Sequence, residues 1–319
     1  MRVLVAGATG AVGRPLCERL VAAGHEVVGT TRSDDGAARL RAAGVEPAVL
    51  DAFDLDALRA AVEAARPEVV INQLTALSAP FNPRRYGEWI AETNRLRAEV
   101  GPALVEIARE TGARRVIAQS ISFVVRPGGE PVADESAPLY LDGPRAMAEA
   151  TGSVATLERG VTGTDGIEGV VLRYGYLYGP GTSYAADGDI ADAVRARRFP
   201  IVGSGAGVFS FVHTHDAADA TVLALDRGEG VLNVVDDEPA PLRDWLPAYA
   251  AALGAPPPRR VPAFLARLAA GSVSVHYGTR QVGASNARAR AGLGWNPGFG
   301  SWREGFPASF AGEDVRIAA

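Results

Sequence analysis

The sequence predicts an α/β protein built on a doubly wound parallel sheet, and three observations support this class. A short β-branched run at residues 3–6 leads directly into a glycine-rich turn. Apolar, strand-like runs then alternate with alanine-rich helical patterns through roughly the first half of the chain. These strands are apolar throughout, which is typical of a parallel sheet covered by helices on both faces.

The individual elements follow from hydrophobic periodicity and from turn residues. Further strands are expected at residues 26–30, 47–50, 68–74, 115–119 and 169–174, and helices at residues 12–23, 34–43, 54–65, 84–110 and 144–159. Gly24, Gly44 and Gly112 stand where helix C-caps belong. Pro102 should kink or split the helix over 84–110, because proline lacks the backbone N–H.

The chain divides into two parts by composition. Residues 1–175 carry the regular strand–helix rhythm and form the expected sheet core. Residues 176–319 are richer in glycine and proline and contain a stiff connector at 254–261. We expect this second part to be mainly a smaller lobe beside the sheet, with some segments returning to the core.

Composition excludes several classes of function. The net charge of −5 and the lack of a basic block argue against a nucleic-acid surface. No 18-residue uncharged apolar stretch exists, and the apolar run at the start is too short for a signal peptide, so we expect no membrane span and a cytoplasmic location. Cys17 is the only cysteine, and His213 and His215 lack further ligands, so no metal site is expected.

One compositional fact bears directly on chemistry: all 32 basic residues are arginine, and the sequence contains no lysine. Arginine effectively never deprotonates, whereas lysine can be tuned into an acid, a base or a Schiff-base former. Any mechanism that needs a lysine is therefore excluded.

The glycine-rich turn predicts a dinucleotide site. It reads Gly7-Ala8-Thr9-Gly10-Ala11-Val12-Gly13 and lies between a strand and a helix. The first glycine permits the tight turn, the second lets the backbone approach a pyrophosphate, and the third lets the helix pack closely on the strand. The pyrophosphate would lie on the free N–H groups of that helix. The alternative is a tight turn without a ligand.

The end of the second strand favours NADP, with NAD still possible. An NAD site usually has an acid about 20 residues past the glycines, which holds the ribose hydroxyls. Here the strand ends Thr30-Thr31-Arg32. Arg32 can pair with a 2′-phosphate, whereas an acid would repel it. A solvated loop arginine is the alternative for Arg32.

With these motifs in order, the chain resembles the extended short-chain dehydrogenase/reductase superfamily, the NAD(P)-dependent epimerase/dehydratase group, and hence a Rossmann-type fold. The resemblance spans nearly the whole chain and includes the glycine turn, the LRYGYLYGPG stretch at 172–181 and the FVH and LGWNP segments of the second half. It implies further cofactor contacts at Asp51, Ala52, Leu74, Thr75, Asn94, Ser120 and Tyr174, beside Gly7, Thr9, Gly10, Ala11, Val12, Gly13, Thr31 and Arg32.

The chain departs from this superfamily at the reaction centre. The superfamily's working parts are a serine or threonine after strand five and a tyrosine four residues before a lysine. Without any lysine, that Tyr-x-x-x-Lys motif is absent. The best ungapped match also puts Ile121, rather than Ser120 or Ser122, at the place of the catalytic hydroxyl. General acid–base assistance is typically worth about 10²–10⁴ in rate, so another group would have to replace it in an ordinary carbonyl reductase.

Tyr140, Ser120 and Ser122 are the candidate catalytic residues, because they lie nearest in sequence to the missing pair. Tyr140 is favoured as proton donor, with a partly buried loop aromatic as the alternative. The expected function is an NADP-binding enzyme of the epimerase, dehydratase or reductase type that acts on a small organic molecule. A non-redox lyase or isomerase, or a non-catalytic NADP-responsive binding protein, is the alternative. The superfamily also suggests a homodimer.

Overall fold

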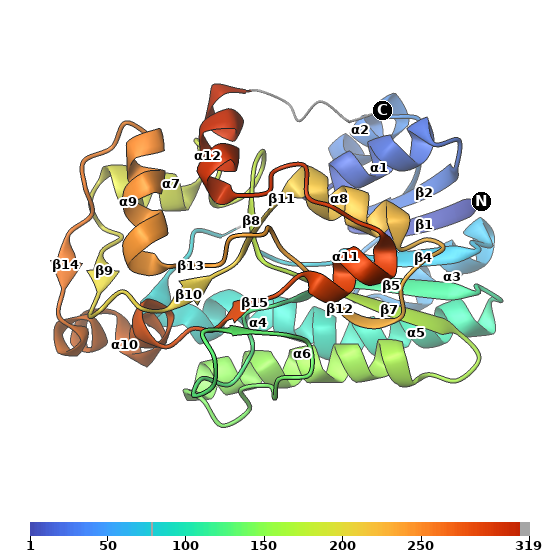
Figure 1. Cartoon of the computed structure of the whole chain (residues 1–319). Helices are drawn as coiled ribbons and strands as arrows, with labels where there is room; N and C mark the ends of the chain where they lie inside the picture. Colours follow the sequence, from blue (N-terminus) through green and yellow to red (C-terminus); the bar gives the residue numbers. More distant parts are fainter. Residues whose placement is uncertain (78, 313–319) are drawn as a thin grey trace.

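The computed structural model describes residues 1–77 and 79–312, and it confirms the predicted doubly wound sheet (Figure 1). Seven parallel strands form this sheet in the order β12-β7-β5-β4-β1-β2-β3. They are β1 (Arg2–Ala6), β2 (Glu26–Thr31), β3 (Glu46–Val49), β4 (Val69–Asn72), β5 (Arg115–Ile121), β7 (Glu168–Tyr174) and β12 (Gly230–Val234). The strand order reverses at β1, so the segments that follow β1 and β4 lead to helices on opposite faces of the sheet and leave room for a ligand between them.

Helices cover both faces of the sheet (Figure 1). One face packs against α1 (Gly13–Ala22), α2 (Asp34–Ala42), α8 (Thr214–Leu223) and α11 (Ala287–Leu293). The other face packs against α3 (Leu55–Ala65), α5 (Gly101–Glu110) and α6 (Arg145–Gly163). Ser33 and Asp54 begin α2 and α3 by accepting a hydrogen bond from a first-turn amide. Each face thus buries its own apolar core.

The helix expected over 84–110 is interrupted, as Pro102 predicted. It consists of α4 (Tyr86–Arg95), the π-helical turn η2 (Leu96–Val100) and α5, with Pro102 in the first turn of α5. Proline cannot donate to the carbonyl four residues before it, and its ring pushes that carbonyl away. A widened turn before the proline accommodates this. Such π turns are frequent at functional sites.

The second half of the chain forms a lobe with an aromatic core. Trp245, Trp302, Tyr249 and Phe211 are fully buried there. Its elements are η1 (Pro83–Arg85) and β6 (Val132–Ala133) from earlier in the chain, with β8 (Tyr176–Tyr178), α7 (Asp189–Arg195), β9 (Ile201–Val202), β10 (Val208–Phe209), β11 (Phe211–His213), β13 (Ala240–Pro241), α9 (Leu242–Ala252), β14 (Arg260–Val261), α10 (Ala263–Thr279), β15 (Gly283–Ala284) and α12 (Trp302–Ala311). β12 returns from this half to the edge of the main sheet, beside β7.

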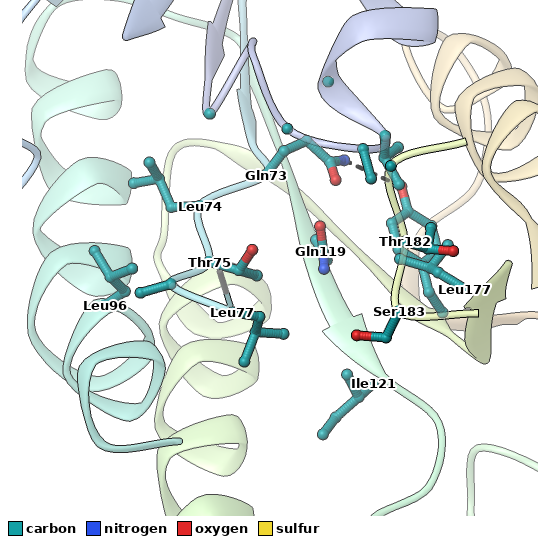
Figure 2. Close-up of a pocket in the computed structure, with 18 of the residues that line it drawn as sticks. Gln73, Leu74, Thr75, Leu77, Leu96, Gln119, Ile121, Leu177, Thr182 and Ser183 are labelled. Atoms are coloured by element: carbon teal, nitrogen blue, oxygen red, sulfur yellow. Dashed lines mark hydrogen bonds between the residues drawn. The ribbon is translucent and has the colours of Figure 1, made fainter. Parts of the chain in front are cut away.

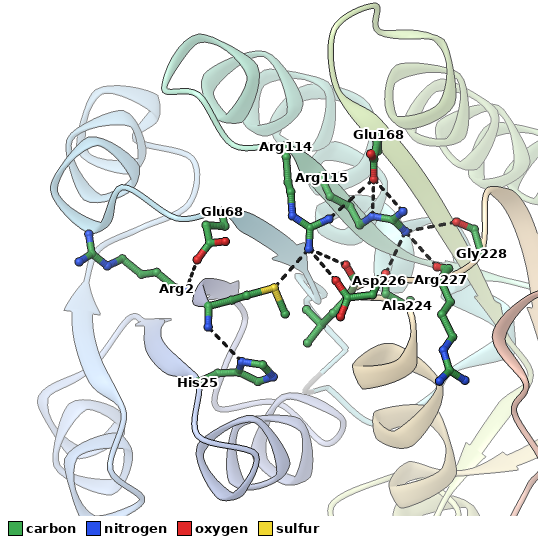
Figure 3. Close-up of polar contacts among 12 residues, drawn as sticks. Arg2, His25, Glu68, Arg114, Arg115, Glu168, Ala224, Asp226, Arg227 and Gly228 are labelled. Atoms are coloured by element: carbon green, nitrogen blue, oxygen red, sulfur yellow. Dashed lines mark hydrogen bonds and ion pairs between the residues drawn. The ribbon is translucent and has the colours of Figure 1, made fainter.

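Ion pairs and hydrogen bonds of charged side chains link neighbouring strands and helices at the amino ends of the strands (Figure 3). The buried Arg115 pairs with Glu168 at 2.7 Å and donates to the carbonyls of Ala224, Arg227 and Gly228. This network fixes the end of α8 against β5 and β7. It lies at the opposite edge of the sheet from the carboxyl ends, where the cavity described below opens. None of the helices in the described part of the chain is long and apolar enough to cross a membrane.

Candidate functional site

A cavity of about 600 Å³ lies at the carboxyl ends of β1, β2, β4 and β5, under the second lobe. Its lining includes most of the cofactor contacts that the sequence predicts, namely Gly7, Thr9, Gly10, Ala11, Val12, Gly13, Thr31, Arg32, Asp51, Ala52, Leu74, Thr75 and Tyr174. Residues widely separated in the chain therefore meet in one place, as the crevice of a doubly wound sheet requires.

The glycine turn forms a cradle that side chains would fill. Gly7 has φ 86°, and a Cβ built on it would lie 2.7 Å from the carbonyl oxygen of Gln73. A Cβ on Gly13 would lie 2.3 Å from the carbonyl oxygen of Gly7. Helix α1 begins at Gly13 with no side-chain cap, so the positive end of its dipole faces the cavity. This arrangement fits the pyrophosphate of a dinucleotide.

Arg32 lies at the mouth of the cavity, just past the end of β2. Its side chain is 67% exposed and forms an ion pair with Glu92 of α4 at 3.5 Å. Within the described part of the chain, Glu92 is its one ion-pair partner. The guanidinium is thus accessible to an anionic group of a bound nucleotide. Asp51, also exposed, accepts a hydrogen bond from the amide of Phe53 at 3.0 Å.

The centre of the cavity is bounded by side chains from the segment after β4, from β5 and from the segment after β8 (Figure 2). Leu74 and Thr75 follow β4, while Gln119 and Ile121 come from β5, and Ser183 lies across from them. The wall therefore consists mainly of apolar groups and neutral polar groups.

A buried hydrogen-bonded chain closes the floor of the cavity beside α1. Gln73 donates to the hydroxyl of Tyr174 at 3.0 Å, and that hydroxyl lies 2.6 Å from the hydroxyl of Thr221. Burial raises the pKa of Tyr174 to about 12, so its phenol stays neutral near pH 7. Tyr174 lines the cavity, but its hydroxyl is already occupied by these two partners.

The predicted catalytic residues do not line this cavity. Ser120 is fully buried and donates to Glu158 at 2.7 Å, within a cluster that Arg173 completes. Ser122 is also buried. Tyr140 stacks on His276, with 5.2 Å between the ring centroids. A catalytic role for the two serines and Tyr140 stays a prediction.

Asn94 is the one remaining predicted cofactor contact that lies outside the lining, apart from Ser120. Its side-chain oxygen accepts a hydrogen bond from Ser153 of α6 at 3.1 Å. It therefore joins α4 to α6, and its contact with a cofactor also stays a prediction.

Alternation along β5 explains why the serines face away. Gln119 and Ile121 line the cavity, whereas Ser120 between them points to the opposite face, toward α6. Neighbouring residues of a strand point to opposite faces, so this outcome follows from the register alone. The sequence match that put Ile121, rather than a serine, at the place of the catalytic hydroxyl already indicated that Ile121 faces the cavity. The same alternation would also have predicted that Gln119 lines the cavity.

The far end of the cavity is aromatic, and sequence patterns pointed to only part of it. Its lining there includes Phe81, Tyr86, Trp89, Phe123, Tyr176, Tyr184, Phe199, Phe209 and Tyr277. Phe123 and Tyr176 stack with 4.3 Å between their centroids. Such walls suit a flat, unsaturated ligand. Four tyrosines, Tyr174, Tyr176, Tyr178 and Tyr184, crowd the turn after β7 in the sequence, and this pattern left two roles open for them, a ring-accepting pocket or packing between the lobes.

The ionisable groups of the lining lack a pair suited to acid–base catalysis. Burial raises the pKa of Tyr86, Tyr174, Tyr176, Tyr184 and Tyr277, so these phenols are neutral and weaker acids than usual. Of the residues that the structure describes, no histidine lines the cavity. No cluster of three metal-ligating side chains was found within the same residues.

The sheet order, the glycine turn and the crevice beside it define a Rossmann-type dinucleotide-binding protein. The chain belongs to the NAD dependent epimerase/dehydratase family, whose model matches residues 3–234. It is thereby an enzyme of the oxidoreductase or epimerase type that uses a nicotinamide cofactor.

Three similar proteins were found, one by sequence and two by structure. A 3-diazoavenalumate denitrifying reductase of Streptomyces is 51% identical over 96% of this chain and 99% of its own. The UDP-glucose 4-epimerase of Thermus thermophilus, solved in complex with NAD, is 26% identical with a TM-score of 0.73 and full coverage of both chains. A human epimerase family protein, solved with NADPH, is 21% identical with a TM-score of 0.74 and covers 98% of this chain and 99% of its own.

Proposed function

We propose that this protein is an NADPH-dependent reductase whose substrate carries a strongly electrophilic group, best represented by an aromatic diazonium. The observation that carries the proposal is a cavity without a proton-transfer group at its centre. The lining holds neither lysine nor histidine among the described residues, and the pKa of each of its tyrosines is raised by burial. This lining favours a reaction that proceeds without a proton from the protein.

The residues of the cradle would hold the cofactor. Gly7, Gly10 and Gly13 leave space for the pyrophosphate, and Arg32 would pair with the 2′-phosphate that distinguishes NADP from NAD. When bound, NADPH supplies a hydride from its nicotinamide ring. Leu74 and Ile121 would shield the reaction from water at the centre of the cavity.

The nature of the hydride acceptor decides whether an acid is needed. When hydride adds to a carbonyl carbon, the oxygen must also receive a proton, and a positioned acid is worth about 10²–10⁴ in rate. A diazonium ion already carries a positive charge. Its reduction balances as Ar–N₂⁺ + H⁻ → Ar–H + N₂, in which the carbon–nitrogen bond breaks, a carbon–hydrogen bond forms and N₂ leaves. This balance requires no proton from the protein.

The Streptomyces relative supports this choice of reaction. Its name describes a reductase that removes nitrogen from a diazo compound, and it is 51% identical to this chain over nearly the full length of both. The aromatic walls formed by residues such as Trp89, Phe123 and Tyr176 suit the arene of such a substrate. An aryl diazo compound thus satisfies both the shape and the chemistry of the cavity.

A pair of matched substrates tests the proposal. The protein would be mixed with NADPH and either 4-carboxybenzenediazonium or 4-carboxybenzaldehyde, which differ in the electrophile. We expect loss of absorbance at 340 nm, release of N₂ and formation of benzoate with the diazonium, above the rate without protein, and no turnover of the aldehyde. Turnover of the aldehyde without turnover of the diazonium would overturn the proposal.

A further inference from the structure

One buried charged side chain of the cavity has a nitrogen without a hydrogen-bond partner in the described part of the chain. Arg97 lies in the π-helical turn η2 and lines the cavity, yet it is only 5% exposed. Its Nη1 atom has no hydrogen-bond partner within residues 1–77 and 79–312. Burying an unpaired charge is costly, and π turns are frequent at functional sites. A bound anionic ligand would therefore supply the hydrogen-bond partner that Nη1 of Arg97 lacks among the described residues.

The surroundings of Arg97 leave one positive charge uncompensated. Glu158 acts on it electrostatically, but both oxygens of that carboxylate already accept from Arg173, at 2.7 and 2.6 Å. Tyr86 and Tyr277 also act on it, and burial keeps both phenols neutral because it raises their pKa. Burial lowers the pKa of Arg97 to about 10, so the guanidinium stays protonated at pH 7.

The phosphates of the cofactor are not suitable partners for this charge. The pyrophosphate belongs at the start of α1, where Arg14 also lines the cavity, and the 2′-phosphate belongs at Arg32. Arg97 instead shares its surroundings with Tyr86 of α4 and Tyr277 of α10, the latter a helix of the second lobe. An anion at Arg97 would thus be part of the substrate.

The geometry points to Arg97 as the anchor for the carboxylate of an aromatic acid. One buried positive charge is neutralised by one negative charge, whereas a phosphate dianion or a nucleotide diphosphate would leave negative charge buried. A planar guanidinium also matches a carboxylate in shape. The neighbouring rings of Tyr86, Trp89 and Tyr277 provide the walls for the arene. This inference rests on the proposed function, since the acid would be the molecule that is reduced.

Binding of an unreactive acid tests the anchor without any turnover. The probe is 4-hydroxycinnamate, compared with its methyl ester by calorimetry on protein saturated with NADP⁺. We expect the acid to bind at least about 10-fold more tightly, the scale of a charge-assisted hydrogen bond. Arg97→Gln should lower the affinity for the acid to that for the ester and leave the ester unchanged, and Arg97→Lys should restore part of the difference.

Controls separate the possible outcomes. Arg145→Gln changes a guanidinium that is 93% exposed and lies outside the lining, and it should leave the acid-to-ester ratio unchanged. Equal affinities of acid and ester for the parent protein would overturn the anchor, even where Arg97→Gln fails to fold. Weaker NADPH binding in Arg97→Gln with unchanged acid binding, or Arg97-dependent binding of UDP-glucose, would also overturn it. An Arg97-dependent preference for the acid in a protein that reduces no diazonium would refute the proposed reaction and retain the anchor.

Discussion

Arg32 and Glu92 form an ion pair across the mouth of the cavity, with 3.5 Å between guanidinium nitrogen and carboxylate oxygen. Arg32 follows β2 and Glu92 belongs to α4, so the pair joins the two sides of the opening. Both side chains are more than half exposed. Exposed pairs of this kind contribute only about 0–1 kcal/mol, so a phosphate can displace Glu92 at little cost.

The first prediction concerns Arg32 and the choice of cofactor. Arg32→Ala should weaken binding of NADPH by about 1.5–3 kcal/mol and that of NADH much less, because only NADPH has a 2′-phosphate to pair with. Calorimetry with both cofactors measures this difference. Glu92→Gln removes the competing carboxylate and should strengthen NADPH binding slightly. Equal losses for the two cofactors in Arg32→Ala would refute the assignment of Arg32.

A pair of glycine substitutions tests the cradle. In Gly13→Ala the new methyl group would lie 2.3 Å from the carbonyl oxygen of Gly7, so the turn must shift. We expect a loss of about 1–3 kcal/mol in unfolding free energy and at least about 10-fold in NADPH affinity.

Gly152→Ala is the matched control for this prediction. Gly152 lies within α6, and a Cβ there meets no atom within 4 Å. Alanine is the better helix former, so this variant should gain about 0.5–1 kcal/mol and bind NADPH as before. Urea unfolding and calorimetry measure both variants. Unchanged cofactor affinity in Gly13→Ala would contradict the role given to the turn.

Local signals in the sequence predicted the sheet and the cradle. The β-branched runs and the glycine trio specify strand, turn and helix within a few residues of one another, so tertiary context adds little. Pro102 is likewise a local signal, because the lack of its N–H affects only the helical turn just before it. Ser120 shows the limit of this reasoning. A register difference of one residue decides whether its hydroxyl meets the cavity or Glu158.

The aromatic end of the cavity depends on tertiary packing, which periodicity does not encode. Arg97 falls within a helical pattern where arginine is ordinarily solvated. Its burial results from the packing of η2 against α6 and from α10, which brings Tyr277 from the second lobe. Only the folded chain shows that this guanidinium is enclosed and unpaired.

His276 should make stability depend on pH. Burial lowers its pKa to about 4 in the folded protein, against an ordinary value of 6.5. Below pH 6.5 the unfolded chain therefore takes up a proton that the folded chain does not, so stability falls as pH falls from 6.5 toward 4. Compared with His276→Phe, the parent should lose about 2 kcal/mol more unfolding free energy between about pH 7.5 and pH 5. Parallel curves for the two proteins in urea titrations would contradict this.

We also propose a homodimer, formed through the helices before and after β5. α4 and α5 pack beside α6 within the chain, and α6 has small, partly exposed residues at Ala146 and Ala148 that allow close approach of a second copy. Light scattering at micromolar concentration should give twice the chain mass of 33.2 kDa. Ala148→Arg should convert the dimer to a monomer, whereas a monomer mass for the parent would refute the proposal.

Tyr140 provides the last test, because its position and the sequence suggest different roles. The sequence marks it as a proton donor, yet its ring stacks on His276 and its amide donates to the carbonyl of Val124 at 2.8 Å, outside the lining of the cavity. A reaction that needs no proton from the protein would not use its hydroxyl. Tyr140→Phe keeps the ring, so we expect diazonium turnover within about twofold of the parent, whereas loss of a positioned acid would lower it by about 10²-fold or more. A loss of that size, with the midpoint of urea unfolding unchanged, would restore Tyr140 as the donor and remove the central argument for a proton-independent reduction.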